Sequence, residues 1–215
     1  LPVEHEVMYY DVWKQEYKGT KNEPAILKDE KAVYVSLELE PGECVVLVET
    51  ANGEPESEHK SFVQQRTDCE KQAGFDAWKV SKVRAIEYPN FEAAEEMKVL
   101  EPISFKEPTF SGVIRYESEV ELDSEPAEAY LYAEHVYEVM KVVVNGNEVG
   151  KCIRPPYQMD VTKDLQKGKN DIVIEVATTP AREQLNGMRP PFDFNHETLE
   201  PTGMYGEVKI YYNEK

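Results

Sequence analysis

The run Val-Val-Val-Asn-Gly-Asn-Glu-Val-Gly at positions 142–150 predicts a β-hairpin. Met140, Val142 and Val144 fall on one side of an extended chain, because successive side chains of a strand alternate between its two faces. The Asn-Gly pair that follows tolerates the positive φ angles that a two-residue type I′ turn requires. A strand that ends in a tight turn and then returns is therefore the first element to expect.

The segment after this hairpin predicts a turn and another strand. Thr162 is placed to cap a single helical turn that contains Leu165, and Gly168 to end that turn in the left-handed conformation. Asp160 and Thr162 are also expected to hydrogen-bond within their own turn. Apolar residues at alternating positions of 172–176 then predict a strand with one buried face.

Residues 110–134 carry the clearest strand pattern of the chain. Mostly apolar side chains occupy every second position from Ile114 to Leu122, and charged side chains fill the positions between them. A slip of one residue would bury the charged row, so the pattern specifies the register. The same alternation recurs at 128–134 and 207–212. Many short strands without a long helical period indicate an all-β antiparallel sandwich.

Several of these motifs together resemble a known module. They occur in the order Phe110–Tyr116, the 142–150 hairpin, Pro-Tyr-x-x-Asp-Val-Thr at 156–162, Gly-x-Asn-x-Ile at 168–172, and Thr202–Val208. This order resembles the non-catalytic jelly-roll module of multidomain glycoside hydrolases. That module is known from the sugar-binding domain of glycoside hydrolase family 2 and from the C-terminal region of α-L-rhamnosidase-like enzymes. The resemblance implies a galactose-binding-like jelly roll that accompanies a separate catalytic barrel.

Residues 1–50 predict a short β unit. Strands are expected at 32–40 and 44–48, joined through Pro41-Gly42, whose residues suit the central positions of a type II turn. In the enzymes named above, a β-sandwich domain precedes the jelly roll. The resemblance therefore implies that this unit is a remnant or a compact version of that domain.

The middle of the chain changes character. Residues 51–74 are polar and rich in turn formers, which predicts a linker with one short helix. Residues 75–215 are then expected to form the jelly-roll domain. Within it, 92–99 predicts a brief helix before Pro102.

Composition limits the classes of partner. The 215 residues include 24 basic and 42 acidic side chains, for a net charge of −18 and a sequence pI near 4.7. Such a chain repels nucleic acid and anionic membranes. No apolar run approaches the roughly 20 residues of a membrane span, so a soluble protein is expected. Cys44, Cys69 and Cys152 are odd in number and widely spaced, which favours packing roles over disulfides or a metal site.

The chain begins at Leu1, with neither a methionine nor a signal-like stretch, which indicates a piece of a longer protein. The absence of a targeting signal therefore says nothing about location. The resemblance implies a bacterial parent that is secreted, periplasmic or on the cell surface.

Catalytic patterns are missing from the sequence. A glycosidase needs two carboxylates flanking the scissile bond, but most acidic residues here fall on alternating, solvent-facing strand positions. No succession of strands and long helices suggests a catalytic barrel. The four histidines form no local zinc motif. We therefore expect no hydrolase activity from this chain and no cofactor.

Sugar binding needs an aromatic ring to stack on a pyranose and fixed polar groups for its hydroxyls. The long connection 180–203 combines both, because loops on rigid sandwiches often carry binding sites. Its candidate residues are Arg189, Phe192, Phe194, Asn195 and His196. These aromatics could equally cap the core or contact other domains.

Further candidates lie outside that connection. Trp78 could be a sugar platform or part of the core, and Arg154 and Tyr157 could line a groove or serve surface pairing and packing. Galactose-binding-like domains often hold a structural calcium ion, and the resemblance makes Glu207 a candidate ligand for it.

The sequence thus predicts a non-catalytic carbohydrate-binding or accessory module. Its expected partners are carbohydrate and the catalytic domain of the same parent chain. One alternative is a purely structural scaffold, which would pack apolar groups of the 180–203 connection inward. Another is a protein-interaction sandwich, which would expose a contiguous apolar patch.

Overall fold

The computed structural model describes residues 5–12, 15–20, 22–27, 30–50, 58–183 and 200–215. The chain divides into two compact units, Leu1–Thr67 and Asp68–Lys215.

The first unit contains two small antiparallel sheets. Its elements are β1 (Glu6–Asp11), β2 (Glu16–Gly19), β3 (Asn22–Leu27), β4 (Glu30–Val35), β5 (Val46–Thr50) and the helix α1 (Phe62–Thr67). One sheet has the order β2-β1-β5, and β3 pairs with β4. Ser61 begins α1 with a reciprocal cap, because its hydroxyl accepts from the Gln64 N–H and the Gln64 side chain accepts from the Ser61 N–H.

The turn predicted at Pro41-Gly42 is confirmed, but the strands around it differ from expectation. Gly42 has a φ of 83°, and the Glu43 N–H donates to the Glu40 carbonyl at 2.9 Å. The first strand ends at Val35, however, and β5 pairs with β1 rather than with β4. The alternation through Leu39 therefore predicted a longer strand than forms. Periodicity states which side chains would share a face, whereas a strand also needs a partner for its backbone.

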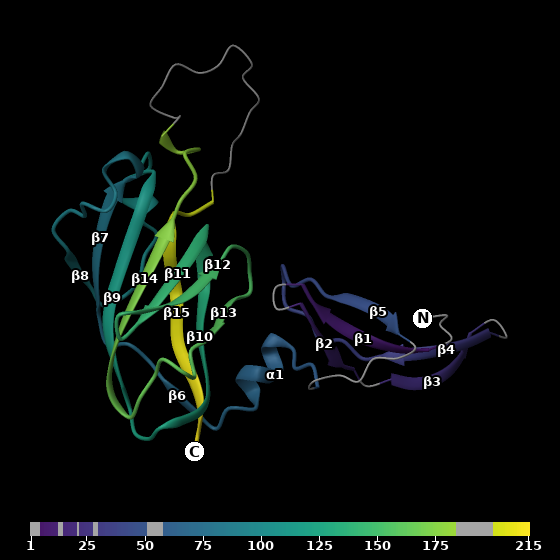
Figure 1. Ribbon diagram of the computed structural model, residues 1–215. Coiled ribbons are helices and arrows are strands. Elements are labelled where there is room, and N and C mark those ends of the chain that lie inside the picture. Colours follow the sequence, from purple (N-terminus) through teal and green to yellow (C-terminus); the bar gives the residue numbers. More distant parts are fainter. Residues whose placement is uncertain (1–4, 13–14, 21, 28–29, 51–57, 184–199) are drawn as a thin grey trace, which may run out of the picture. The chain divides into compact units, whose positions relative to one another are not determined.

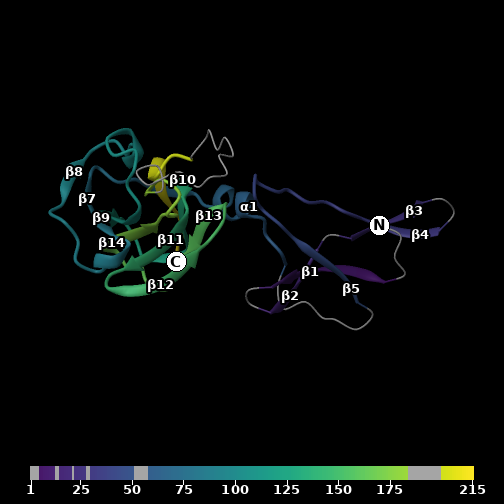
Figure 2. The same cartoon turned by 90° about the horizontal axis from the view of Figure 1, so that it is seen from above.

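The second unit is an antiparallel sandwich of two sheets (Figures 1 and 2). Its six-stranded sheet has the order β12-β11-β14-β9-β7-β8, and its four-stranded sheet the order β13-β10-β15-β6. The elements are β6 (Lys71–Ala73), β7 (Trp78–Arg84), η1 (Ala85–Glu87), β8 (Glu95–Met97), η2 (Ile103–Phe105), β9 (Gly112–Leu122), β10 (Pro126–Tyr137), β11 (Val139–Val144), β12 (Asn147–Cys152), β13 (Tyr157–Asp160), β14 (Gly168–Ala177) and β15 (Gly203–Glu214). The predicted all-β sandwich is confirmed.

The core lies between the two sheets. Ile114 and Ile174 from the larger sheet and Leu131 and Ile210 from the smaller one are all fully buried. The sheets are also joined by a polar contact, because the buried Tyr116 hydroxyl accepts from the Met204 N–H at 2.8 Å. Burial of this kind, at about 25 cal/mol per Å² of apolar surface, is the main stabilising term of such a unit.

The predicted hairpin is confirmed. Asn145 and Gly146 have φ angles of 50° and 82°, and β11 pairs with β12 across them. The Asn145 side chain donates to the Asp164 carbonyl at 2.8 Å and to Asn170 Oδ1 at 2.9 Å. The turn residue thereby ties the hairpin to the segment that precedes β14 and to β14 itself.

The turn after β13 differs in its cap. Gly168 has the expected left-handed conformation, with a φ of 88°. The capping acceptor, however, is Asp160, whose carboxylate accepts from the Thr162 N–H at 3.0 Å. The Thr162 hydroxyl instead accepts from the Ala129 N–H at 2.9 Å. The same hydroxyl donates to Asp160 Oδ1 at 2.7 Å, so the expected hydrogen bonding of Asp160 and Thr162 within their own turn is confirmed.

Two further expectations change. The helix predicted at 92–99 is wrong, because Glu95–Met97 form the edge strand β8 and pair with Trp78–Val80. The stretch predicted as a linker contains the expected short helix, α1 of the first unit, but its end forms the strand β6, which pairs with Ile210–Tyr212 of the second unit. Residues 51–57 of this stretch lie outside the described residues. Among the residues placed in the structure, no helix is long and apolar enough to cross a membrane.

Candidate functional site

A row of charged side chains crosses the outer face of the six-stranded sheet. The strand register aligns Arg115 of β9 with Glu175 of β14, and Glu175 with Lys141 of β11. The neighbouring row, which includes Tyr116 and Ile174, is buried in the core. Because side chains alternate along a strand, the charged row points away from the core.

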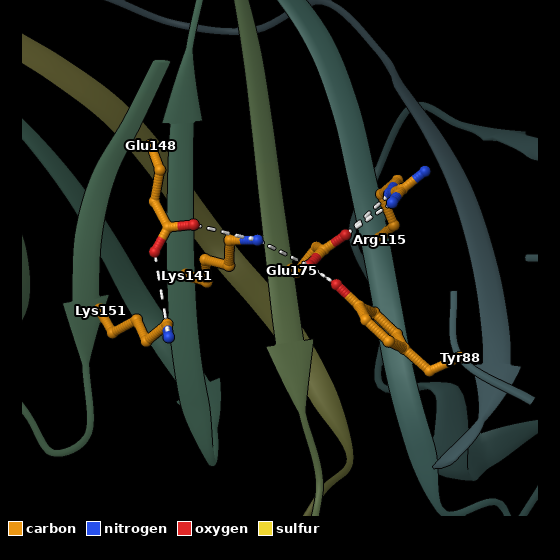
Figure 3. Close-up of polar contacts among 6 residues, drawn as sticks. All are labelled: Tyr88, Arg115, Lys141, Glu148, Lys151 and Glu175. Atoms are coloured by element: carbon orange, nitrogen blue, oxygen red, sulfur yellow. Dashed lines mark hydrogen bonds and ion pairs between the residues drawn. The ribbon is translucent and has the colours of Figure 1, made fainter. Parts of the chain in front are cut away.

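Glu175 is the centre of this row, as Figure 3 shows. Its side chain is only 8% exposed although it lies on an outer face. Oε1 accepts from Arg115 Nε at 3.0 Å and from Nη2 at 2.7 Å. Oε2 accepts from the Tyr88 hydroxyl at 3.1 Å and lies 3.5 Å from Lys141 Nζ. Lys141 also pairs with Glu148 of β12 at 3.4 Å.

These contacts favour the ionised forms of both Glu175 and Lys141. Burial alone would raise the pKa of Glu175, but the hydrogen bonds from Arg115 and the charge of Lys141 outweigh it and lower that pKa below its usual value. Burial acts to lower the pKa of Lys141, yet the charges of Glu175 and Glu148 raise it above its usual value. Glu175 and Lys141 therefore stay ionised at neutral pH.

An aromatic pair from the connection after η1 borders the row. Tyr88 is 45% exposed, and its ring meets that of Phe91 edge to face at 5.9 Å. The Arg115 guanidinium lies over the Phe91 ring, 3.8 Å from its centroid, in a cation–π contact. The Tyr88 ring is thus anchored through its hydroxyl while much of its surface faces solvent.

The arrangement suits binding better than acid–base catalysis. A general acid must hold a proton near the working pH, whereas Glu175 is kept ionised and both of its oxygens are engaged. An exposed ring beside fixed guanidinium and ammonium groups can instead stack on a ligand and donate hydrogen bonds to it.

The predicted site residues fare differently. Arg189, Phe192, Phe194, Asn195 and His196 lie outside the described residues. The flanks of that connection are described, and Arg182 there donates to the carbonyls of Pro108 and Glu200.

Trp78 belongs to the core and offers no ring face to a sugar. It is 3% exposed and packs against Phe75, with ring centroids 4.5 Å apart. Tyr157 is 7% exposed, and its hydroxyl donates to the Glu138 carbonyl at 2.6 Å. Arg154 is half-buried, and its Nη1 donates to the carbonyl of the next residue, Pro155, at 3.5 Å. A groove lined by both Arg154 and the Tyr157 ring is therefore not what this segment forms.

The expected calcium ligand is engaged with a cation. Glu207 pairs with Lys209 at 2.7 Å, and its side chain is 65% exposed. Within the described ranges, no group of three or more His, Cys, Asp or Glu side chains is arranged to hold a metal. Calcium is also bound by backbone carbonyl oxygens, so the calcium site at Glu207 stays a prediction.

Sequence reasoning missed the charged row. One signal was available, because Glu175 is the single charged residue in the strand-like run Ile-Val-Ile-Glu-Val-Ala at 172–177. An isolated acid in such a run indicates a cation on a neighbouring strand. Its partner Arg115 could not be named, because the pairing of β14 with β9 is set by tertiary structure.

Comparisons with known proteins give structural matches only. No protein-family model matches the chain, and a search of curated protein sequences finds no match. A rhamnosidase from Novosphingobium sp. PP1Y matches 98% of this chain and 21% of its own, at 20% identity and a TM-score of 0.67. A β-glucuronidase from Faecalibacterium prausnitzii matches 69% of this chain and 32% of its own, at 16% identity and a TM-score of 0.52. The chain has the fold of one part of these glycoside hydrolases.

A β-glucuronidase from Ruminococcus gnavus, solved in complex with D-glucuronic acid, matches 66% of this chain and 30% of its own, at 17% identity and a TM-score of 0.50. The chain thus spans about a fifth to a third of the length of the solved structures it matches. The fold resemblance expected from the ordered motifs is confirmed.

Proposed function

We propose that this chain is a non-catalytic accessory module of a glycoside hydrolase. Its second unit binds carbohydrate at the Tyr88–Arg115 site, which consists of Tyr88, Phe91, Arg115, Lys141 and Glu175. The observation that carries the proposal is the Tyr88 ring, which is 45% exposed and tied through its hydroxyl to the buried Glu175. A ring anchored in this way stacks on the apolar face of a pyranose without losing side-chain freedom on binding. Arg115 and Lys141, oriented by the same carboxylate, supply hydrogen bonds to the sugar.

A binding role would also explain why the buried side chain of Glu175 is a charged one. A buried ion pair is seldom the most stable choice for a fold, because desolvation offsets most of the attraction. Glu175 is useful if the orientation of Arg115, Lys141 and Tyr88 matters for a ligand. This argument supports a binding role for the row over a purely structural one.

A glycan array on the complete chain tests the proposal. Tyr88→Ala removes the ring, and Tyr34→Ala is the matched control, because Tyr34 is 69% exposed in the first unit. We expect selective binding by the wild-type chain and the control, and loss of binding by Tyr88→Ala with an unchanged circular dichroism spectrum. Silence from the folded wild type, or equal binding by Tyr88→Ala, would reject the site.

The non-catalytic part of the proposal has its own test. We expect no hydrolysis of aryl glycosides by the purified chain. Hydrolysis that a single carboxylate substitution abolishes would overturn it.

A scaffold role is the second candidate function. It is favoured by exposed apolar side chains in the connections around β8: Ile86 is 92% exposed, and Val99 and Phe105 are each 74% exposed. Such side chains are suited to packing on a catalytic domain of the same parent. Under this alternative, the double substitution Ile86→Asp, Phe105→Asp lowers the thermal stability of the full-length parent enzyme but leaves that of the present chain unchanged. Equal stability of both parent enzymes would remove the scaffold candidate.

A further inference from the structure

The hydrogen-bonding groups of the Tyr88–Arg115 site are unevenly distributed. Both oxygens of Glu175 are engaged, by Arg115 on one side and by Tyr88 and Lys141 on the other. The carboxylate of Glu148 is likewise shared, because it lies 3.4 Å from Lys141 and 3.9 Å from Lys151. The charged acceptors of the site are therefore occupied by its own cations.

Donors remain available. Arg115 uses Nε and Nη2 on Glu175, and its Nη1 has no hydrogen-bond partner in the part of the chain that the structure describes. Figure 3 shows the guanidinium extending beyond Glu175. Lys141 carries three N–H groups but faces two carboxylates, and Lys151 is 60% exposed. A ligand here meets donors first.

The net charge of the row also favours a ligand that accepts hydrogen bonds and is negatively charged. Three cations, Arg115, Lys141 and Lys151, stand against two carboxylates, Glu175 and Glu148. The row therefore carries one net positive charge on a chain whose net charge is −18.

The next positions along the sheet limit this patch. Glu117 of β9 is paired in register with Val173, and Glu119 with Asp171. Each of these acids has a lysine beside it, since Lys79 is in register with Glu117 and Lys169 pairs with Glu119, whereas Arg115 keeps a donor without a partner among the described residues.

We infer that the ligand of this site is an acidic glycan, with a uronic-acid residue stacked on Tyr88 and its carboxylate at Arg115 Nη1, on the side of the guanidinium away from Glu175. The inference rests on the proposed carbohydrate-binding function and names its ligand class. A carboxylate accepts hydrogen bonds without donating any, which matches a site that has spare donors and occupied acceptors.

Isothermal titration calorimetry on the complete chain tests this inference. The probes are a short oligogalacturonate and its methyl ester, which share a backbone but differ in charge. A sulfated neutral oligosaccharide is the third probe, and sodium acetate and sodium sulfate at the same concentrations are the simple anions. We expect the oligogalacturonate to bind at least about tenfold more tightly than the ester, a difference near 1.4 kcal/mol. Its affinity should fall as salt is added.

Variants locate the binding. Lys141→Met keeps the aliphatic stem and removes the charge, and Arg115→Lys keeps the charge and removes the guanidinium fork. Arg115→Lys should weaken oligogalacturonate binding about tenfold, and Lys141→Met, whose charge lies on the other side of Glu175, should weaken it less, both with little effect on the ester. Lys169→Met is the control, because Lys169 is 76% exposed on β14 and pairs with Glu119.

The outcomes separate this inference from the function on which it rests. Tighter binding of the ester than of the acid overturns the acidic ligand and keeps carbohydrate binding. Binding of neither glycan by the folded chain rejects both. Equal binding of the sulfated probe, or competition by acetate alone, shows that the site recognises negative charge in general and overturns the uronate as its ligand. Loss of affinity in Lys169→Met equal to that in Lys141→Met would move the site elsewhere.

Discussion

Replacing Glu175 with glutamine removes the charge at the centre of the outer row while keeping the shape of the side chain. Glu175 accepts two hydrogen bonds from Arg115 and one from Tyr88, and it pairs with Lys141. Hydrogen bonds to a charged group contribute about 1.5–3 kcal/mol each. Glutamine keeps one acceptor oxygen, and the side chains of Arg115 and Lys141 are 29% and 26% exposed, so water recovers part of the loss. We expect a net destabilisation of about 2 kcal/mol.

The pH dependence gives this prediction a specific signature. The folded-state pKa of Glu175 lies below its usual value, which is about 4.3 for an unperturbed glutamate. Its contribution is therefore complete above that value and is lost as the pH falls through the lowered folded-state pKa. The stability difference between the wild type and Glu175→Gln should be constant at neutral pH and should shrink below about pH 4.

Urea unfolding followed by tryptophan fluorescence measures this difference. Trp13 is replaced by phenylalanine in every protein, so that the emission reports on the buried Trp78 of the second unit. Glu121→Gln is the matched control, because Glu121 is an exposed acid on the outer side of β9. Thermal unfolding followed by the same emission is the second measurement. At about 2–4 °C per kcal/mol, the melting temperature should fall by roughly 4–8 °C for Glu175→Gln only. A loss equal to that of Glu121→Gln, or one that persists unchanged at pH 3, would refute the assigned role.

Three further outcomes are expected. Tyr116→Phe should cost about 1–3 kcal/mol in urea unfolding, because the buried Met204 N–H loses its acceptor; a loss below about 0.5 kcal/mol would show that another group replaces the hydroxyl. Gly146→Ala should destabilise the second unit by about 1 kcal/mol, since its φ of 82° is unfavourable for alanine, and a neutral or stabilising effect would contradict the turn geometry. In thiol labelling at pH 7, Cys44 should react faster than Cys152, because Cys44 is exposed while burial raises the pKa of the Cys152 thiol; peptide mapping that finds Cys152 labelled first would contradict this.

Local patterns in the sequence were sufficient for the elements of the sandwich. The alternation from Ile114 to Leu122 identified the buried face of β9, and the Asn-Gly pair at 145–146 identified the hairpin. Both depend on short-range physics, since a strand exposes alternate side chains to opposite faces and a type I′ turn needs positive φ. The same reasoning failed at 92–99, where a segment without strong periodicity was drawn into an edge strand by the free side of β7.

The same patterns could not identify which strands pair with each other. Residues around Pro41-Gly42 predicted two strands joined directly by a turn, yet β5 pairs with β1 from the start of the chain. The turn itself formed as expected. Backbone hydrogen bonds are alike in every strand, so the choice among partners depends on long-range packing rather than on local sequence.

By itself, the sequence determined the fold class, the buried face of the main strands, the acidic character of the chain and the ordered motifs that resemble a glycoside hydrolase module. Tertiary structure alone decided the candidate site, because Tyr88, Arg115, Lys141 and Glu175 come from four separate segments. Their meeting requires β9, β14 and β11 to lie side by side, in a register that aligns one guanidinium, one carboxylate and one ammonium. That alignment is a property of the assembled sheet, since buried charges persist only where a neighbouring strand supplies the opposite charge.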